Sequence, residues 1–359
     1  MSKTNLNNYV CMIPFTTLEI HKGARFLCCA SWLKKYLPDH TTPKDAWESD
    51  VANDIRESVL DGSYRYCDKQ QCPYLSQLKN VGNVSKLNTG PLKLKSNLSN
   101  EDEKKITEYK NKILNPSLIE FSFDKTCNLK CPSCRIKIIS ASKKEIEEIK
   151  ETIDLIQDQY GKTVKTLYIT GTGDPFLSVG FRDFLRNFDA TKWPNLQKIH
   201  LHTNATRWNK KMWESMSKVH KYVKSCEISI DAATKDTYEN KTRLGGNWDE
   251  LIDNLKFIST IPTLKSIKTS FVVQQSNYKE MKQFYDLMYF IFGNKVNVFF
   301  GKITNWGTFT DEAFFKHKIW DKAHPDYDDF VAEVNSFILN DKIWHNLQEF
   351  INTSNKNLI

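Results

Sequence analysis

The sequence predicts an α/β protein with a parallel sheet, a cysteine-rich N-terminal segment and a helical C-terminal extension. The main observation is that apolar segments alternate with amphipathic stretches from Leu118 onward, which is typical of right-handed β-α-β units. The predicted strands are 118–124, 165–170, 196–203, 226–230, 266–274 and 295–302. The predicted helices between them are 142–160, 179–188, 210–219, 248–260 and 278–292. The pattern alone does not say whether the sheet closes into a barrel.

Residue types and spacing support each of these elements in chain order. Residues 1–85 hold short apolar runs, and 18–28 predict a β-hairpin that turns at Lys22-Gly23. Residues 86–116 predict a polar linker with a short helix whose N-cap is Ser99. In the helix at 142–160, four isoleucines spaced by three and four residues form one apolar face. The core therefore spans 117–305, and an aromatic-rich helical extension at 306–359 is expected to cover one face of it.

Composition excludes several functional classes. The 359 residues include 51 Lys and Arg against 43 Asp and Glu, a formal charge of +8, without a basic arm or tail. A dedicated nucleic-acid binder is therefore not expected. No apolar run approaches the ~20 residues that a membrane-spanning helix needs, and the first ten residues lack the apolar centre of a signal peptide. We expect a cytoplasmic protein without a membrane partner.

The nine cysteines are grouped, which indicates metal or cluster ligands more than disulfides in a reducing compartment. Cys127, Cys131 and Cys134 follow the first core strand with C-x3-C-x2-C spacing, on a loop at the carboxyl end of a parallel strand. Three thiolates suit three corners of a [4Fe–4S] cluster and leave one iron open. A structural zinc ion would normally take four protein ligands, so three indicate a reactive site.

In this loop the sequence resembles the radical S-adenosylmethionine (SAM) superfamily, and the resemblance covers about residues 117–305. It implies a partial (β/α)6 barrel and a [4Fe–4S] cluster whose open iron binds SAM. Transfer of an electron would cleave SAM to methionine and a 5′-deoxyadenosyl radical, which abstracts a hydrogen atom from the substrate.

Later motifs extend this resemblance and imply the SAM contacts. Gly171-Thr-Gly-Asp-Pro175 is similar to the family's motif for the SAM ammonium group, and Asn204 belongs to a motif at the third strand end. By resemblance Ser229 and Asp231 lie near the ribose, and Arg243 pairs with the SAM carboxylate. The implied SAM-binding residues are Gly173, Asp174, Asn204, Ser229, Asp231 and Arg243. Considered singly, each of them is also a common turn or cap residue.

A second cluster is expected from the N-terminal cysteines. Cys11 and Cys28 fit the C-x(9–15)-G-x4-C opening of SPASM and twitch domains, and Cys67 and Cys72 complete four thiolates. Four thiolates fill a [4Fe–4S] cluster without a vacancy, although they also suit zinc. The spacing favours Cys28 over the adjacent Cys29 as a ligand. The ninth cysteine, at position 226, is expected to be an ordinary buried strand residue.

These features predict a radical SAM enzyme with an auxiliary [4Fe–4S] cluster that oxidatively modifies a peptide or protein. The alternatives are a radical SAM dehydrogenase or epimerase of a sugar or nucleoside and, in another class, a non-catalytic zinc or iron–sulfur protein. Expected partners are the substrate and a reductant such as flavodoxin or ferredoxin. No catalytic acid or base is assigned. The candidate substrate contacts, at later strand ends, are Gln274, Asn277, Asn305 and Trp306.

Overall fold

The computed structural model describes residues 6–30, 32–35, 37, 42–78, 90–337 and 343–351. The chain forms two compact units, in which segments far apart in sequence come together. Unit 1 contains 1–124, 144–172 and 189–199, and unit 2 contains 125–143, 173–188 and 200–359.

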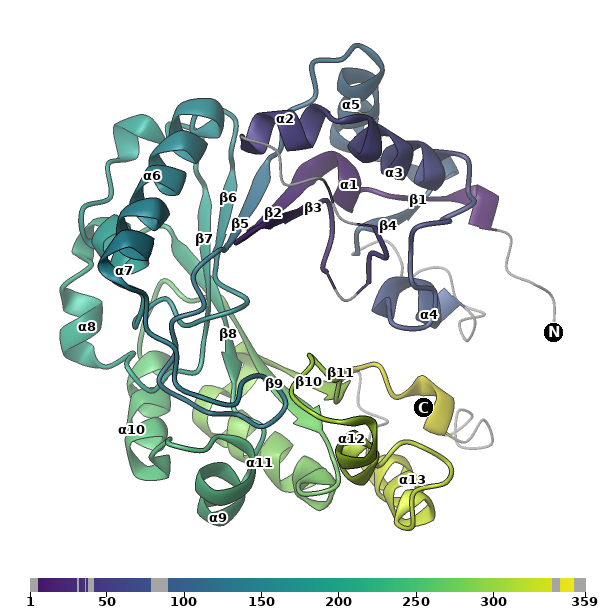
Figure 1. Ribbon diagram of the computed structural model, residues 1–359, viewed down its shortest axis with the longest axis vertical. Coiled ribbons are helices and arrows are strands. Elements are labelled where there is room, and N and C mark those ends of the chain that lie inside the picture. Colours follow the sequence, from purple (N-terminus) through teal and green to yellow (C-terminus); the bar gives the residue numbers. More distant parts are fainter. Residues whose placement is uncertain are drawn as a thin grey trace. The chain divides into compact units, whose positions relative to one another are not determined.

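Unit 1 contains the N-terminal cysteines and a set of neighbouring strands (Figure 1). These strands are β2 (Thr17–His21), β3 (Ala24–Phe26), β5 (Leu118–Ser122) and β6 (Thr166–Ile169), in the order β6-β5-β2-β3. The pairs β5-β6 and β2-β5 are parallel, whereas β2 and β3 form an antiparallel hairpin. Gly23 has a φ of 77° in the turn of this hairpin, a conformation that glycine adopts without a steric cost. A separate antiparallel pair joins β1 (Tyr9–Cys11) to β4 (Leu92–Leu94).

Six helices surround the strands of unit 1. They are α1 (Ile13–Thr16), α2 (Pro43–Glu48), α3 (Asp50–Leu60), α4 (Pro73–Leu78), α5 (Asn100–Lys110) and α6 (Lys143–Tyr160). The side chain of Ser99 caps α5, and Asp102 completes a capping box, as the polar sequence of this helix favours. Along α6, Ile149, Ile153 and Ile156 are buried, which confirms the predicted apolar face.

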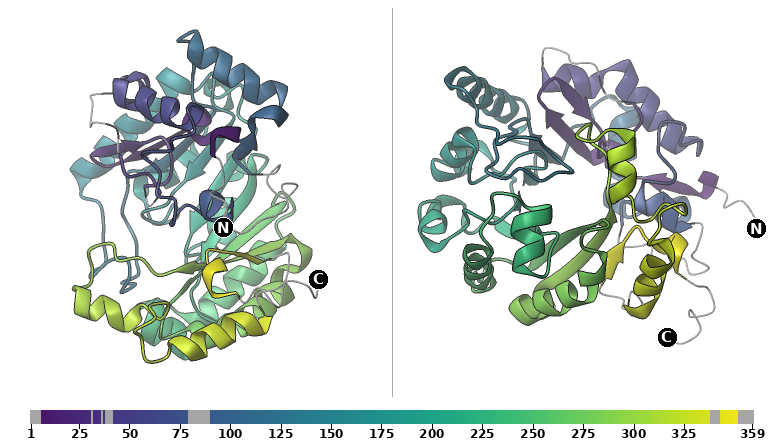
Figure 2. Two further views of the ribbon diagram at one scale, coloured as in Figure 1. Left: turned by 90° about the vertical axis from the view of Figure 1, so that its right-hand side faces the viewer. Right: turned by 60° about the horizontal axis from the view of Figure 1, so that its bottom comes forward.

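Unit 2 contains a parallel sheet with helices packed against it (Figures 1 and 2). The strands, in sheet order, are β7 (Lys198–Thr203), β8 (Val223–Ser229), β9 (Ser266–Val273), β10 (Val296–Lys302) and β11 (Ile343–His345). Phe271 of β9 and Phe300 of β10 contact Phe284 of α11 (Met281–Phe292), so one sheet face packs against that helix. The opposite face carries Lys268 and Phe299, whose side chains alternate with those of the packed face.

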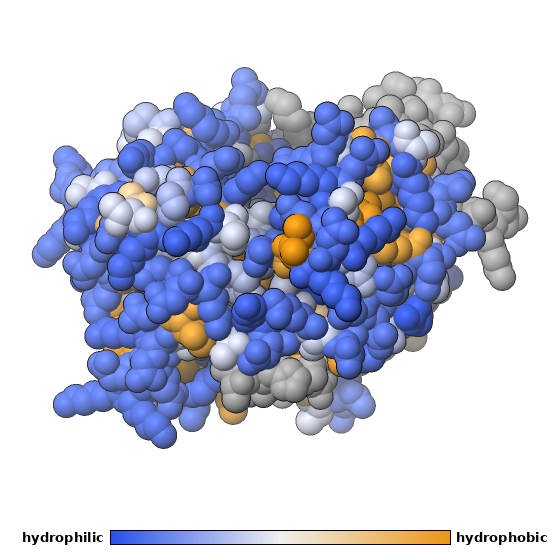
Figure 3. All heavy atoms as spheres, turned by 90° about the horizontal axis from the view of Figure 1, so that it is seen from above, coloured by the Kyte–Doolittle hydropathy of each residue, from blue (hydrophilic) through white to orange (hydrophobic). Residues whose placement is uncertain are grey.

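The helices of unit 2 include those of the C-terminal extension. They are α7 (Val179–Arg186), α8 (Lys210–Glu214), α9 (Lys235–Thr237), α10 (Trp248–Ser259), α11 (Met281–Phe292), α12 (Asp311–His317) and α13 (Tyr327–Phe337). Within the described segments, no helix is both long enough and apolar enough to cross a bilayer. The face shown in Figure 3 is mainly hydrophilic, with small separate hydrophobic groups.

The predicted α/β class is confirmed, and all six predicted strands and five predicted helices are present. The prediction missed β11 inside the extension, because three residues are too few to show a strand period. It also missed that the N-terminal hairpin joins the parallel sheet through β2 and β5. The predicted domain boundaries near 85, 116 and 305 stay a prediction, and residues 86–89 of the predicted linker at 86–116 lie outside the described residues.

Candidate functional site

The loop with Cys127, Cys131 and Cys134 is closed by its own backbone. Cys127 and Ile139 exchange N–H···O bonds of 2.9 and 3.2 Å, and the amide of Cys134 donates to the carbonyl of Cys131 at 2.9 Å. At the opposite side, the amide of Lys130 donates to the carbonyl of Leu244. Cys127 and Cys131 are buried, whereas Cys134 is exposed, and all three are free thiols. The loop therefore holds the three sulfurs in fixed surroundings.

Each of these three sulfurs accepts a hydrogen bond from a side-chain N–H group. Nδ2 of Asn204 donates to Cys127 Sγ at 3.5 Å, and Nη1 of Arg243 donates to Cys131 Sγ at 3.5 Å. Nη2 of Arg135 donates to Cys134 Sγ at 3.2 Å.

These donors suit thiolates better than thiols. Burial is the main effect on the pKa of Cys127 and Cys131 and raises both, while the guanidinium groups of Arg135 and Arg243 act in the opposite direction. Hydrogen bonds to cysteine sulfurs are typical of iron–sulfur sites, where they tune the cluster. The donor set therefore fits a [4Fe–4S] cluster at this loop.

Asp174 is the most enclosed of the predicted SAM contacts, with 1% of its surface exposed. Its carboxylate accepts hydrogen bonds from Oγ1 of Thr203 at 2.6 Å and from the amides of Asn204 and Phe176 at 2.8 and 3.0 Å. Burial raises its pKa, and these three bonds oppose that effect. A carboxylate can accept about four such bonds, so Asp174 retains capacity for one more donor.

Arg243 and Asp231 form a buried ion pair next to the cysteine loop. Nη2 of Arg243 lies 2.7 Å from Oδ2 of Asp231, and Nε donates to the carbonyl of Ile230 at 3.3 Å. Together with the bond to Cys131, three of the five guanidinium N–H groups are used, and two are left for a ligand. Oδ1 of Asp231 accepts the amide of Val272 at 2.7 Å, so this carboxylate also orders the end of β9. Burial raises the pKa of Asp231, and Arg243 opposes the rise.

A row of polar side chains lies on the sheet face opposite α11. Oγ of Ser229 contacts Nε2 of His202 at 3.0 Å and Oγ of Ser270 at 3.2 Å. One step back along the strands, Lys268 forms a 3.1 Å ion pair with Glu227. Burial raises the pKa of Glu227, but Lys268 and the nearby histidines outweigh it and lower this pKa to about 2.

The sequence interpretation missed Lys268 as the partner of Glu227. The two residues occupy alternate positions on strands predicted separately, and their pairing depends on a register that only the sheet defines. Strand alternation was the one signal that placed them on a common face.

The four predicted substrate contacts differ in their surroundings. Both amide hydrogens of Asn277 are donated to backbone carbonyls, and its Oδ1 accepts the amide of Gln274, so Asn277 orders the turn after β9. Gln274 is buried. Asn305 bonds the backbone of Gly307 and Phe309, whereas Trp306 is exposed. Substrate contact by these residues stays a prediction.

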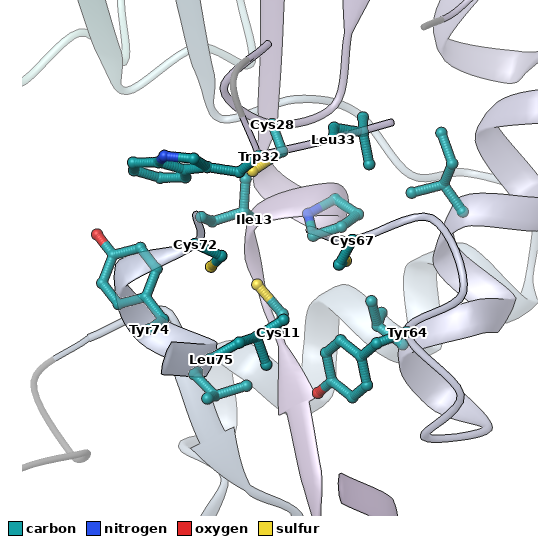
Figure 4. Close-up of a pocket in the computed structure, with 14 residues that line it drawn as sticks. Cys11, Ile13, Cys28, Trp32, Leu33, Tyr64, Cys67, Cys72, Tyr74 and Leu75 are labelled. Atoms are coloured by element: carbon teal, nitrogen blue, oxygen red, sulfur yellow. The ribbon is translucent and has the colours of Figure 1, made fainter. Parts of the chain in front are cut away.

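In unit 1, four N-terminal cysteines line one pocket, and Figure 4 shows them around a common space. They are Cys11, Cys28, Cys67 and Cys72, while Cys29 is not part of the lining. Trp32, Tyr64, Tyr74 and aliphatic side chains form much of the remaining wall. Burial raises the pKa of all four thiols, that of Cys67 to about 12, so a metal would have to displace their protons.

Two further results concern metals and the remaining cysteine. Over the residues that the structure describes, no three His, Cys, Asp or Glu side chains are grouped so as to hold a single metal ion. A [4Fe–4S] cluster has a different requirement, since it distributes its cysteines over several irons. Cys226 is buried within β8, as expected for a structural residue.

Comparison with known proteins gives one family match, over part of the chain. Residues 122–288 match the family model of the radical SAM superfamily. No curated protein matches the chain. Among solved structures, SuiB of Streptococcus suis is 14% identical with a TM-score of 0.45, and the match covers 82% of this chain and 61% of SuiB.

Two other solved structures are similarly distant. SuiB bound to the precursor peptide SuiA matches with 14% identity, a TM-score of 0.43, and coverage of 97% of this chain and 75% of that chain. The structure of anSMEcpe with bound AdoMet matches with 16% identity and a TM-score of 0.40, over 52% of this chain and 51% of that chain. In the match to SuiB given in the preceding paragraph, the chain spans about three fifths of the length of SuiB.

Proposed function

We propose that this chain is a radical SAM enzyme that oxidatively modifies a peptide or protein and that an auxiliary [4Fe–4S] cluster assists it. Residues 122–288 match the radical SAM superfamily model. The observation that carries the proposal is that the sulfurs of Cys127, Cys131 and Cys134 each accept an N–H bond. When bound there, a [4Fe–4S] cluster supplies the electron that cleaves SAM reductively and yields the 5′-deoxyadenosyl radical.

The chain's own residues bind and orient SAM in this proposal. The carboxylate of Asp174, which follows Gly173 in the chain, accepts a hydrogen bond from the SAM ammonium group at its remaining acceptor position. Arg243 directs its two unused N–H groups at the SAM carboxylate, a task that suits its planar fork. Asn204 holds Cys127 through its amide, and Ser229 and Asp231 contact the ribose.

The auxiliary cluster is assigned to Cys11, Cys28, Cys67 and Cys72. The four cysteines line one pocket, which supports this assignment. A cluster held by four thiolates has no open position for SAM. Such a cluster suits electron transfer, and removal of a second electron turns hydrogen abstraction into a two-electron oxidation. This logic, with the SPASM and twitch resemblance of the N-terminal cysteines, supports an oxidation as the net reaction.

Anaerobic reconstitution tests the SAM chemistry. The holoenzyme is expected to contain about eight irons per chain, in two clusters of four, and to release 5′-deoxyadenosine from SAM with dithionite. Cys131→Ala removes a thiolate that the first cluster requires and should abolish this release. Cys226→Ala, a buried cysteine outside both sites, is the matched control and should retain it. Bound zinc without SAM cleavage would instead identify a non-catalytic metalloprotein.

The substrate class is tested with short peptides encoded beside the gene. Mass spectrometry after turnover is expected to find a peptide that has lost two hydrogen atoms. Loss of hydrogen from an added sugar or nucleoside, with every such peptide unchanged, would contradict the peptide proposal and leave the SAM chemistry intact.

A further inference from the structure

Tyr238 begins a π-helical turn that follows β8 in the chain. The turn spans Tyr238–Thr242, and the amide of Arg243 closes it by donating to the carbonyl of Tyr238 at 2.8 Å. In such a turn an amide bonds the carbonyl five residues back, and single turns of this kind are frequent at functional sites. The turn fixes Tyr238 relative to Arg243, whose Nη1 donates to Cys131 Sγ at 3.5 Å.

The hydroxyl end of the Tyr238 ring lies against Gly246. A Cβ atom at Gly246 would lie 2.5 Å from Cε1 and 3.0 Å from Cζ of the ring, so any side chain at this position would displace the ring. Two residues before this glycine, the carbonyl of Leu244 accepts the amide of Lys130, which belongs to the cysteine loop. The same short segment therefore contacts both the hydroxyl end of the ring and the loop.

The hydroxyl of Tyr238 is enclosed and unused by the folded chain. Tyr238 is 0% exposed, and no described residue forms a hydrogen bond with its Oη atom. Burial is the main effect on the pKa of this hydroxyl and raises it, so the group keeps its proton and stays a donor. The charges of Arg243, Cys131 and Asp231 also affect this pKa. A buried hydroxyl without a partner costs free energy and calls for an explanation, such as a group that binds beside it.

We propose that the Tyr238 hydroxyl donates a hydrogen bond to a sulfur atom of the [4Fe–4S] cluster held by Cys131, and that this bond raises the reduction potential of the cluster. The proposal rests on the proposed function, which assigns that cluster to the cysteine loop. A hydrogen bond to a cluster sulfur favours the reduced form, because reduction adds negative charge to the cluster. Asn204 and Arg243 donate to cysteine sulfurs in the folded chain itself, whereas the bond of Tyr238 forms only with the cluster.

Redox titration of the reconstituted holoenzyme, followed by electron paramagnetic resonance, tests this bond. The signal that changes on addition of SAM identifies the loop cluster, since a cluster with four thiolates has no open iron. Tyr238→Phe removes the hydroxyl alone. It is expected to keep about eight irons per chain and to shift the midpoint potential of this signal to more negative values.

Tyr160→Phe is the matched control. The hydroxyl of Tyr160, on α6, is also buried and has no hydrogen-bond partner among the described residues. Burial raises its pKa, and the charges that also affect this pKa belong to α2 and α3. The potential of the loop cluster in Tyr160→Phe should therefore equal that of the wild type.

Pulsed electron paramagnetic resonance in D2O separates a direct bond from an effect of the fold. Exchangeable deuterons at hydrogen bonds to the reduced loop cluster are detected, and Tyr238→Phe should lose the contribution of one deuteron, whereas Tyr160→Phe should keep it. A lowered potential with unchanged deuteron signals would show that the hydroxyl acts through the fold, and would overturn the proposal. So would an unchanged potential, or loss of the loop cluster from Tyr238→Phe. If the wild type forms no cluster that responds to SAM, the proposed function fails, and the bond from Tyr238 fails with it.

Discussion

Asn204, Arg243 and Arg135 each donate an N–H group to one sulfur of the cysteine loop, and the three donors come from different parts of the chain. Arg135 is adjacent to its partner in sequence, whereas Arg243 lies 112 residues from Cys131. Sulfur hydrogen bonds and nearby positive charge stabilise the thiolate form that iron requires. The loop therefore supplies the proposed ligands, and the chain segments after β7 and after β8 supply two of the groups that contact them.

Cys28 and Cys29 give a test at the level of one residue. Cys28→Ala is expected to lower the iron content by about four per chain, because Cys28 lines the thiol pocket. Cys29→Ala is the matched control and should keep the iron, since Cys29 is outside that lining. Iron analysis after anaerobic reconstitution measures both variants. Loss of iron in Cys29→Ala alone would assign the ligand to Cys29.

Strands β8 and β9 place the Glu227–Lys268 pair on the sheet face opposite α11. Their parallel register aligns the two residues, and alternation puts Ser229 and Ser270 on the same face one step further on. Opposite charges across neighbouring strands stabilise the pairing that brings them together. The polar row thus belongs to the sheet rather than to either strand alone.

The lowered pKa of Glu227 predicts a pH-dependent contribution to stability. Its value of about 2 in the folded chain lies below the ordinary 4.5, so the unfolded chain binds more protons in acid. The contribution, about 3 kcal/mol at most, is present above pH ~4.5 and is lost as the pH falls toward 2. The free energies of unfolding of wild type and Glu227→Gln should therefore differ most above pH 5 and converge in acid.

Urea titrations at several pH values check this expectation. Glu214→Gln is the control, because Glu214 forms an exposed pair with Lys210 on α8, worth less than about 1 kcal/mol. If the free energies of unfolding of wild type and Glu227→Gln differ by a constant amount down to pH 3, the charge of the Glu227 carboxylate contributes nothing to stability.

At the scale of the whole molecule, the two groups of cysteines belong to different compact units. The pocket thiols lie in unit 1, and the cysteine loop lies in unit 2 together with Asp174, Asn204 and Arg243. Each group has its own backbone and its own buried surroundings. We therefore expect each group to load metal independently of the other.

Independent loading predicts complementary variants. Cys72→Ala should lose about four irons per chain and still bind SAM, because the loop cluster stays intact. Cys131→Ala should lose a similar number and keep the iron of the pocket. Iron analysis and equilibrium dialysis with labelled SAM measure both properties. Loss of all iron from either single variant would show that the two sites assemble together.

The sequence by itself determined the secondary-structure elements and predicted a reactive loop. Apolar periodicity located the six core strands and five helices, and the spacing of Cys127, Cys131 and Cys134 predicts a cluster site at their loop. Ser99 and Gly23 behave as their residue types predict, as an N-cap and a hairpin turn. These features depend on residues close together in the chain, whose conformational preferences act locally.

Only the tertiary structure decided which distant residues meet. It joined the N-terminal hairpin to β5, added β11 beside β10, paired Lys268 with Glu227, and placed Asn204 and Arg243 against the cysteine sulfurs. It also placed Cys28, and not Cys29, in the lining of the thiol pocket. These contacts arise from strand register and from packing across long stretches of chain. No local pattern encodes them, because a register shift by one residue turns every side chain of a strand to the other face.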